Sequence, residues 1–143
     1  MNLLVTIAAT QFQHIANHAR ITYPEECCGF LLGLDRGTRS IVRVLTAQNV
    51  NNESRTNRYS IDPLDLLRAE NEARRQNLDV IGIYHSHPDA PAQPSLVDLK
   101  QAWPYYTYIV LSVQNGNPAE VSAWTLSRDR SVFELEELRI VDS

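Results

Sequence analysis

The chain has 143 residues, 43% of them hydrophobic, which is enough to bury one sizeable core, so we expect a single domain over residues 1–143. A formal net charge of −4 and the lack of any basic run argue against nucleic acid as the main partner. The N-terminal apolar run is too short to span a membrane and no basic residue precedes it, so we expect a soluble cytoplasmic protein.

The first 22 residues have the pattern of a strand followed by a helix. Residues 3–7 are apolar and predict the strand. Thr10 and Gln13 have the spacing of a capping box, which predicts a helix start. The apolar face of this helix consists of Phe12, Ile15, Ala16 and Ala19. His14 and His18 point away from that face with no third ligand near, and we interpret them as exposed to solvent.

A β-hairpin and a long loop come next. Residues 27–34 form a near-continuous apolar strand, and the Asp35–Gly37 segment has turn composition. Residues 40–47 are rich in β-branched side chains and predict the second strand of the hairpin. Residues 48–57 are polar and rich in Asn, without any periodicity. Loops of that length often have a function of their own.

The remaining elements follow a second helix. Residues 59–61 predict a short strand, and Asp62 before Pro63 is a strong helix start. The buried face of that helix consists of Leu66, Ala69 and Ala73. Apolar strands are expected at residues 78–84, 106–113, 121–126 and 132–138. This order predicts an α/β fold with a mixed β-sheet flanked by helices.

The stretch from residue 78 to residue 98 has the pattern of a metal site. The strand over residues 78–84 runs into His85 and His87, which share one face because side chains alternate along a strand. Ser95 is expected as the N-cap of a following helix, with Asp98 in its first turn. A loop that folds back brings Asp98 over the two histidines. Two imidazoles and a carboxylate leave a fourth tetrahedral position for water, as in catalytic zinc sites.

Such a site needs a base beside the water, and the candidates are Glu25, Glu26 and Asp89. The only cysteines, Cys27 and Cys28, are neighbours and cannot form a disulfide framework. We interpret them as small buried apolar side chains rather than as nucleophiles.

Two motifs together point to a family. Residues 85–98 read His-x-His-x(7)-Ser-x-x-Asp, and Glu26–Gly29 reads Glu-x-Cys-Gly at the start of a strand. This combination resembles the JAMM (MPN-plus) zinc metalloproteases, which include deubiquitinating isopeptidases, and is most similar to the short single-domain prokaryotic members. The resemblance implies the MPN/JAMM architecture, which is related to that of cytidine deaminases.

The resemblance also implies a role for each motif residue. His85, His87 and Asp98 would bind Zn²⁺, Glu26 would be the general acid/base, and Ser95 would stabilise the tetrahedral intermediate. The implied substrate is a ubiquitin-like protein of the sulfur-carrier type, cleaved after its Gly-Gly tail. We expect such a tail to lie extended along a strand edge.

Other interpretations stay open at this point. The Ser95–Asp98 pair is also a good helix cap that needs no metal. A binding module that holds zinc, or no metal, and recognises a ubiquitin-like tail without cutting it is the alternative function. Two histidines and a carboxylate also ligate iron in non-haem oxygenases, although the α/β order disfavours their usual jelly-roll scaffold. The oligomeric state is open.

Overall fold

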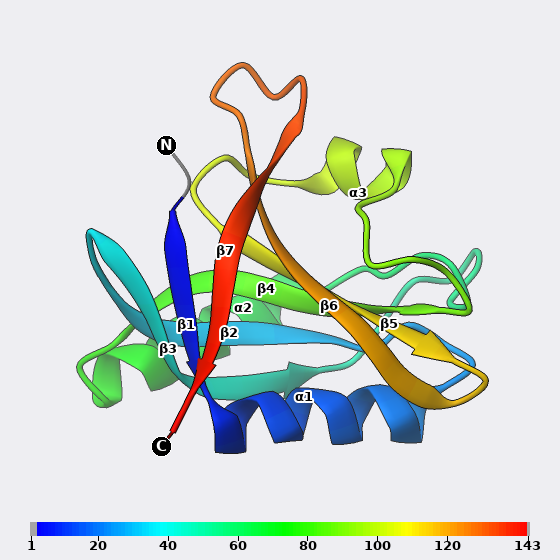
Figure 1. Cartoon of the computed structure of the whole chain (residues 1–143), viewed down its shortest axis with the longest axis horizontal. Coiled ribbons are helices and arrows are strands. Elements are labelled where there is room, and N and C mark those ends of the chain that lie inside the picture. The colour runs from blue at the N-terminus through cyan, green and yellow to red at the C-terminus, as the bar shows by residue number, and fades with distance from the viewer. Residues whose placement is uncertain (1–2, 143) are drawn as a thin grey trace.

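The computed structural model describes residues 3–142, which form ten regular elements (Figure 1). The strands are β1 Leu4–Ala8, β2 Cys28–Arg36, β3 Thr38–Ala47, β4 Asp79–Pro88, β5 Thr107–Gln114, β6 Asn117–Leu126 and β7 Phe133–Val141. The helices are α1 Ala9–Thr22, α2 Pro63–Arg75 and α3 Leu96–Gln101. Within the described part of the chain, no helix has both the length and the apolar character needed to cross a membrane.

The strands form one mixed sheet, as predicted, in the order β1-β3-β2-β4-β5-β6-β7. The sheet closes on itself because β1 pairs in parallel with both β3 and β7 (Figure 1). β4 and β5 also pair in parallel, and the other neighbouring strands are antiparallel. Each strand in residues 3–142 therefore has a partner on both sides. We expected a substrate tail to lie along an unpaired strand edge. In this closed sheet, such an edge is available only at those residues of a strand that lie beyond its paired segment.

Helices α1 and α2 pack on opposite faces of this sheet. Along β2, Leu31 belongs to the core cluster that contains Ile15, Ala16 and Ala19 of α1. Its neighbours point the other way, as alternation along a strand requires. Phe30 and Leu32 belong to a second cluster, with Ala69 and Ala73 of α2. The apolar faces predicted for α1 and α2 are thus confirmed.

The capping box predicted for α1 is wrong. The helix starts at Ala9, directly after β1, and its N-cap Ala8 makes no side-chain cap bond. Gln11 is buried instead, and its Oε1 accepts a hydrogen bond from the Val44 N–H of β3 at 2.9 Å. The strand runs into the helix without a loop, so the chain has turned before Thr10.

Two smaller expectations are also wrong. Residues 59–61 are not a strand, because the Ser60 N–H donates to the side-chain oxygen of Asn49 (3.1 Å) rather than to a β ladder. His18 is half-buried rather than exposed, and its Nδ1 lies 2.7 Å from the hydroxyl of Tyr84. In both cases a polar side chain from another part of the chain decides the outcome. Asn49 binds the backbone of Ser60, and Tyr84 binds the ring of His18.

Candidate metal centre

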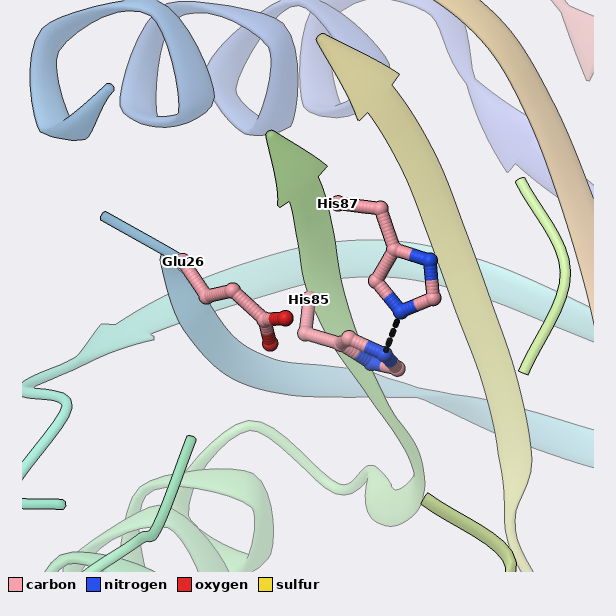
Figure 2. Close-up of side chains that lie close together, drawn as sticks. All are labelled: Glu26, His85 and His87. Atoms are coloured by element: carbon pink, nitrogen blue, oxygen red, sulfur yellow. Dashed lines mark hydrogen bonds between the residues drawn. The ribbon is translucent and has the colours of Figure 1, made fainter. Parts of the chain in front are cut away.

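The two histidines of the motif lie at the C-terminal end of β4 and point to the same face. The Nε2 atoms of His85 and His87 are 3.1 Å apart, and both side chains are buried (Figure 2). Ser86 between them points to the opposite face, where its Oγ accepts a hydrogen bond from the Cys27 N–H at 2.8 Å. The alternation predicted from the sequence is confirmed. Pairing with β2 on one side and β5 on the other keeps this end of β4 in place.

Asp98 reaches the histidines through the cap of α3. The Asp98 N–H donates to Ser95 Oγ (3.1 Å), and Asp98 Oδ2 accepts from the Ser95 N–H (2.8 Å), which is the predicted capping box. The same Oδ2 lies 3.1 Å from His85 Nε2 and 3.0 Å from His87 Nε2. The cap therefore orients the carboxylate towards the imidazole pair.

The three converging atoms fit a metal ion. His87 Nδ1 donates to the Pro91 carbonyl oxygen (2.9 Å), so the Nε2 atom of the neutral ring carries a lone pair. His85 Nε2, His87 Nε2 and Asp98 Oδ2 all lie within 3.1 Å of one another. With bonds of about 2.0–2.1 Å, the ligand atoms of a tetrahedral zinc site lie about 3.3 Å apart. Electron-rich atoms this close need protons or a cation between them, and a divalent metal suits this donor set.

The electrostatics of the cluster favour an ionised Asp98 and a neutral His85. Burial opposes ionisation of Asp98, but the facing imidazoles and the Ser95 N–H together hold its pKa well below the usual range. Burial lowers the pKa of His85. Burial also acts to lower the pKa of His87, but its hydrogen bonds to Asp98 and Pro91 outweigh that effect and raise it overall. Asp98 therefore stays ionised and faces a neutral His85 and a His87 ring that takes up a proton more readily than a free imidazole.

Glu26 lies beside this cluster, just before β2. Its side chain is buried, and one carboxylate oxygen lies within 4.8 Å of a ring nitrogen of both His85 and His87 (Figure 2). Oε1 of Glu26 is buried and has no hydrogen-bond partner within residues 3–142. Burial raises the pKa of Glu26 to about 8. A group with such a pKa takes up and releases protons near neutral pH, as a general acid/base must.

The other two candidate bases are turned away from the cluster. The Glu25 side chain is partly exposed and pairs with Arg55 (3.4 Å). Asp89 is exposed, and it accepts hydrogen bonds from the Tyr23 hydroxyl (2.6 Å) and the Asn115 N–H (2.9 Å). Of the three carboxylates considered from the sequence, Glu26 is the one that the fold places beside the histidines.

A cleft of about 330 Å³ opens onto this arrangement. Its walls include Glu26, His87 and Ser95, together with residues of the 48–57 loop and of the segment that joins β4 to α3. Ser95 is exposed to the cleft, while its Oγ caps α3. A cleft that can hold a substrate therefore lies beside the buried Glu26 carboxylate and the candidate metal ligands.

Comparison with known proteins identifies the family. A family model described as prokaryotic homologs of the JAB domain matches residues 8–127. The chain belongs to this family. The match includes every residue of the candidate centre, and it confirms the resemblance to the JAMM (MPN-plus) proteins and the predicted fold class.

Individual relatives of the JAB family agree with this assignment. The desampylase of Pyrococcus furiosus is 34% identical over 114 residues, which cover 78% of this chain and 74% of that protein. A probable TtuB-protein conjugate cleaving protease of Thermus thermophilus is 40% identical over 79 residues, 55% of this chain and 53% of that protein. A solved structure from Desulfitobacterium hafniense superimposes with a TM-score of 0.86 at 29% identity and covers 98% of this chain and 94% of that one.

Two features of this JAB domain that border the centre have no signal in the sequence. The ring of Tyr59 stacks on His85, with ring centroids 4.5 Å apart and an angle of 25° between the planes. Asn49 donates a hydrogen bond to the Glu26 carbonyl oxygen at 3.0 Å. In the sequence, only the polar, Asn-rich composition of residues 48–57 indicated that this loop has a function.

The cysteines of this JAB domain are packing residues, as predicted. Cys27 and Cys28 are both buried and neither forms a disulfide. Burial raises the pKa of Cys27 to about 11 and raises that of Cys28 as well. Thiols of this kind are protonated at neutral pH and are poor nucleophiles.

Proposed function

We propose that this chain is a zinc-dependent isopeptidase that hydrolyses the bond after the C-terminal tail of a ubiquitin-like protein. The observation that carries the proposal is the convergence of His85, His87 and Asp98 within 3.1 Å, with the buried Glu26 carboxylate beside them. Relatives whose names describe a desampylase and a protease that cleaves TtuB-protein conjugates support this choice of reaction. The cytoplasmic location and the single domain over residues 1–143 stay predictions from the sequence.

In this proposal His85, His87 and Asp98 hold the zinc ion. When bound, zinc supplies a Lewis acid that lowers the pKa of water to about 7 and polarises the substrate carbonyl. Glu26 takes the proton from the attacking water and later delivers it to the leaving amine. Burial raises the pKa of that carboxyl group to about 8, so both proton transfers are feasible near neutral pH.

Ser95 has the role of stabilising the oxyanion. Its Oγ already accepts a hydrogen bond from the Asp98 N–H, so the hydroxyl hydrogen is free to donate to a developing negative charge. The substrate tail lies in the cleft between the 48–57 loop and residues 88–95. A Gly-Gly end suits this place because glycine brings no side chain and allows the backbone to approach the buried carboxylate closely.

The test uses a sulfur-carrier protein extended beyond its Gly-Gly end, with cleavage followed by mass spectrometry and the metal content measured on the same sample. Glu26→Gln keeps the shape of the side chain and removes the base, so we expect a fall of about 100-fold or more in kcat with unchanged zinc content. Glu25→Gln is the matched control, because it makes the same change on the partly exposed neighbouring residue, and it should cleave like the unmodified protein.

Other outcomes would contradict the proposal. Cleavage that survives both Glu26→Gln and removal of metal by a chelator excludes this mechanism. Bound zinc and a bound tail without cleavage would favour the binding module. Iron in place of zinc would favour the oxygenase chemistry considered from the sequence.

A further inference from the structure

The position of the Glu26 carboxylate depends on its backbone. Oε1 is buried and has no hydrogen-bond partner within residues 3–142, so no hydrogen bond to this oxygen fixes its position relative to the histidines. Glu26 also precedes the first residue of β2, Cys28, and therefore lies outside the β ladder. Its two backbone groups are bonded to another segment instead. The Glu26 N–H donates to the Arg55 carbonyl (2.7 Å), and its carbonyl accepts from Asn49 Nδ2 (3.0 Å).

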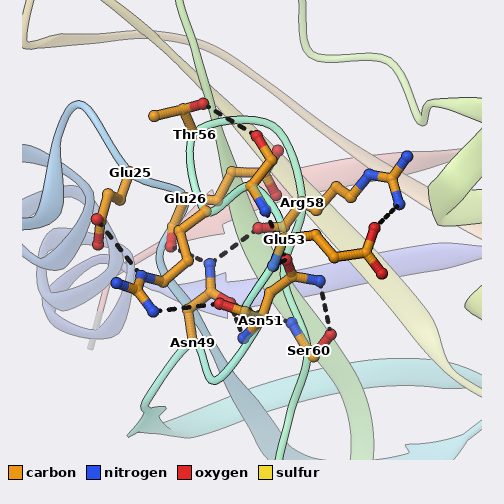
Figure 3. Close-up of polar contacts among 10 residues, drawn as sticks. Glu25, Glu26, Asn49, Asn51, Glu53, Thr56, Arg58 and Ser60 are labelled. Atoms are coloured by element: carbon orange, nitrogen blue, oxygen red, sulfur yellow. Dashed lines mark hydrogen bonds and ion pairs between the residues drawn. The ribbon is translucent and has the colours of Figure 1, made fainter.

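Asn49 organises the segment that holds Glu26 (Figure 3). Besides the Glu26 carbonyl, its Nδ2 donates to the Arg58 carbonyl (2.9 Å). Its Oδ1 accepts from the N–H groups of Asn51 (3.0 Å) and Ser60 (3.1 Å). A side-chain amide has two N–H donors and two acceptor positions, and all four are used here. One side chain thus joins both ends of the loop to each other and to the backbone of Glu26.

We propose that Asn49 is a positioning residue that sets where the Glu26 carboxylate lies relative to His85 and His87. This inference rests on the role proposed above for Glu26. The Asn49 amide fixes the Glu26 carbonyl directly, and it fixes the Glu26 N–H indirectly by holding the loop that contains Arg55. A displacement of about 1 Å at a reacting group can cost about 100-fold in rate, so losing this tether should be visible in kcat.

Asn49→Asp tests the tether with little change in shape. The aspartate keeps an oxygen that can accept from Asn51 and Ser60, but it has no donor and places an oxygen against the carbonyls of Glu26 and Arg58. We expect kcat to fall about 10- to 100-fold, with KM changed by less than about twofold and zinc content unchanged.

Asn51→Asp is the matched control in the same loop. The Asn51 side-chain oxygen accepts from the N–H groups of Glu53 and Ser54, which an aspartate continues to do. Among residues 3–142, its Nδ2 donates to the Ser60 hydroxyl alone, and that hydroxyl can rotate and donate to a carboxylate instead. This variant adds the same negative charge, so we expect kcat within about twofold of the unmodified protein.

A double-mutant cycle separates positioning from a general structural effect. If Asn49 acts through Glu26, Asn49→Asp should slow the Glu26→Gln variant by less than about twofold, because the group it positions is already gone. Three results would each overturn the inference. Asn49→Asp could lower kcat equally in the unmodified protein and in the Glu26→Gln variant, it could keep full activity, or it could recover its activity at high pH. A negative charge near Glu26 raises the pKa of that base, and high pH would then restore its ionised form. Recovery at high pH would therefore mean that the added charge, and not the lost tether, had lowered the rate.

Amide hydrogen exchange gives a readout that does not depend on catalysis. The Glu26 N–H is protected by its bond to Arg55, so Asn49→Asp should speed its exchange about tenfold or more, while Asn51→Asp should not. Unchanged exchange in Asn49→Asp would overturn the tether even in an active enzyme. If the unmodified protein cleaves no conjugate, the proposed function fails, and the exchange rate then decides on its own whether Asn49 holds Glu26 in place.

Discussion

Replacing Asp98 by Asn tests the metal centre with a minimal change. The amide oxygen can take the place of Oδ2 and accept from the Ser95 N–H, so the cap of α3 survives. What is lost is the negative charge that faces the two Nε2 atoms at 3.1 and 3.0 Å. The variant should therefore fold normally and bind zinc more weakly.

The expected magnitude follows from linkage between binding and folding. Changes to groups that only support a metal ligand cost about 10–100-fold in affinity, so the loss of an anionic ligand should cost at least about 100-fold. Free zinc at about 1,000 times the dissociation constant raises the free energy of unfolding by about 4.1 kcal/mol. A 100-fold weaker site at the same free zinc loses about 2.7 kcal/mol of that gain. For a chain of about this length, the zinc-induced rise in Tm should shrink by about 5–11 °C.

The assay is thermal unfolding with and without zinc at a buffered free concentration. Asp89→Asn is the control, because it makes the same change on an exposed carboxylate two residues after His87. Comparing the zinc-induced shifts removes any effect of either substitution on the metal-free fold. A full-size shift in Asp98→Asn would refute Asp98 as an anionic ligand. The same reduction in Asp89→Asn would mean that only the general charge of this region matters.

Two further predictions concern the packing around the centre. A Cβ atom on Gly29 would lie 2.3 Å from Tyr84 Cε2 and 2.4 Å from the Leu45 carbonyl oxygen, so Gly29→Ala should lower the free energy of unfolding by about 1–3 kcal/mol. Urea unfolding of the zinc-free protein measures this, and an unchanged midpoint would contradict the close approach. Because burial raises the pKa values of Cys27 and Cys28, neither should react with iodoacetamide at neutral pH in the folded protein, whereas both should react in urea. Mass spectrometry counts the added groups, and labelling of the native protein would show that this end of β2 opens.

The parts of the centre that could be predicted from the sequence are those set by local geometry. Side chains alternate along any strand, so two histidines separated by one residue had to share a face. Ser95 and Asp98 have the spacing of a capping box, which fixes the carboxylate within one helical turn. Both features need only neighbouring residues, and both are present in the structure.

The parts that depend on distant segments could not be predicted in the same way. Closure of the sheet requires β1 to pair with both β3 and β7, and a five-residue strand does not indicate its partners. The stacking of Tyr59 on His85 joins two segments that are remote in the sequence. The choice of Glu26 over Glu25 rested on the family motif, since in isolation both residues have the same chemistry and the fold alone separates them.

The helix cap and the proposed metal donor set are not competing interpretations of the Ser95–Asp98 pair, because a single oxygen can serve both. Asp98 Oδ2 accepts the Ser95 N–H at 2.8 Å while it faces both imidazoles. The cap orders the carboxylate before any ion binds, and the Pro91 carbonyl does the same for the ring of His87. A donor set that is ordered in advance loses little conformational entropy on binding, so more of the interaction energy is available for affinity. The ordinary helix-capping pattern at the start of α3 is thus a physical reason why a metal site can form at this place.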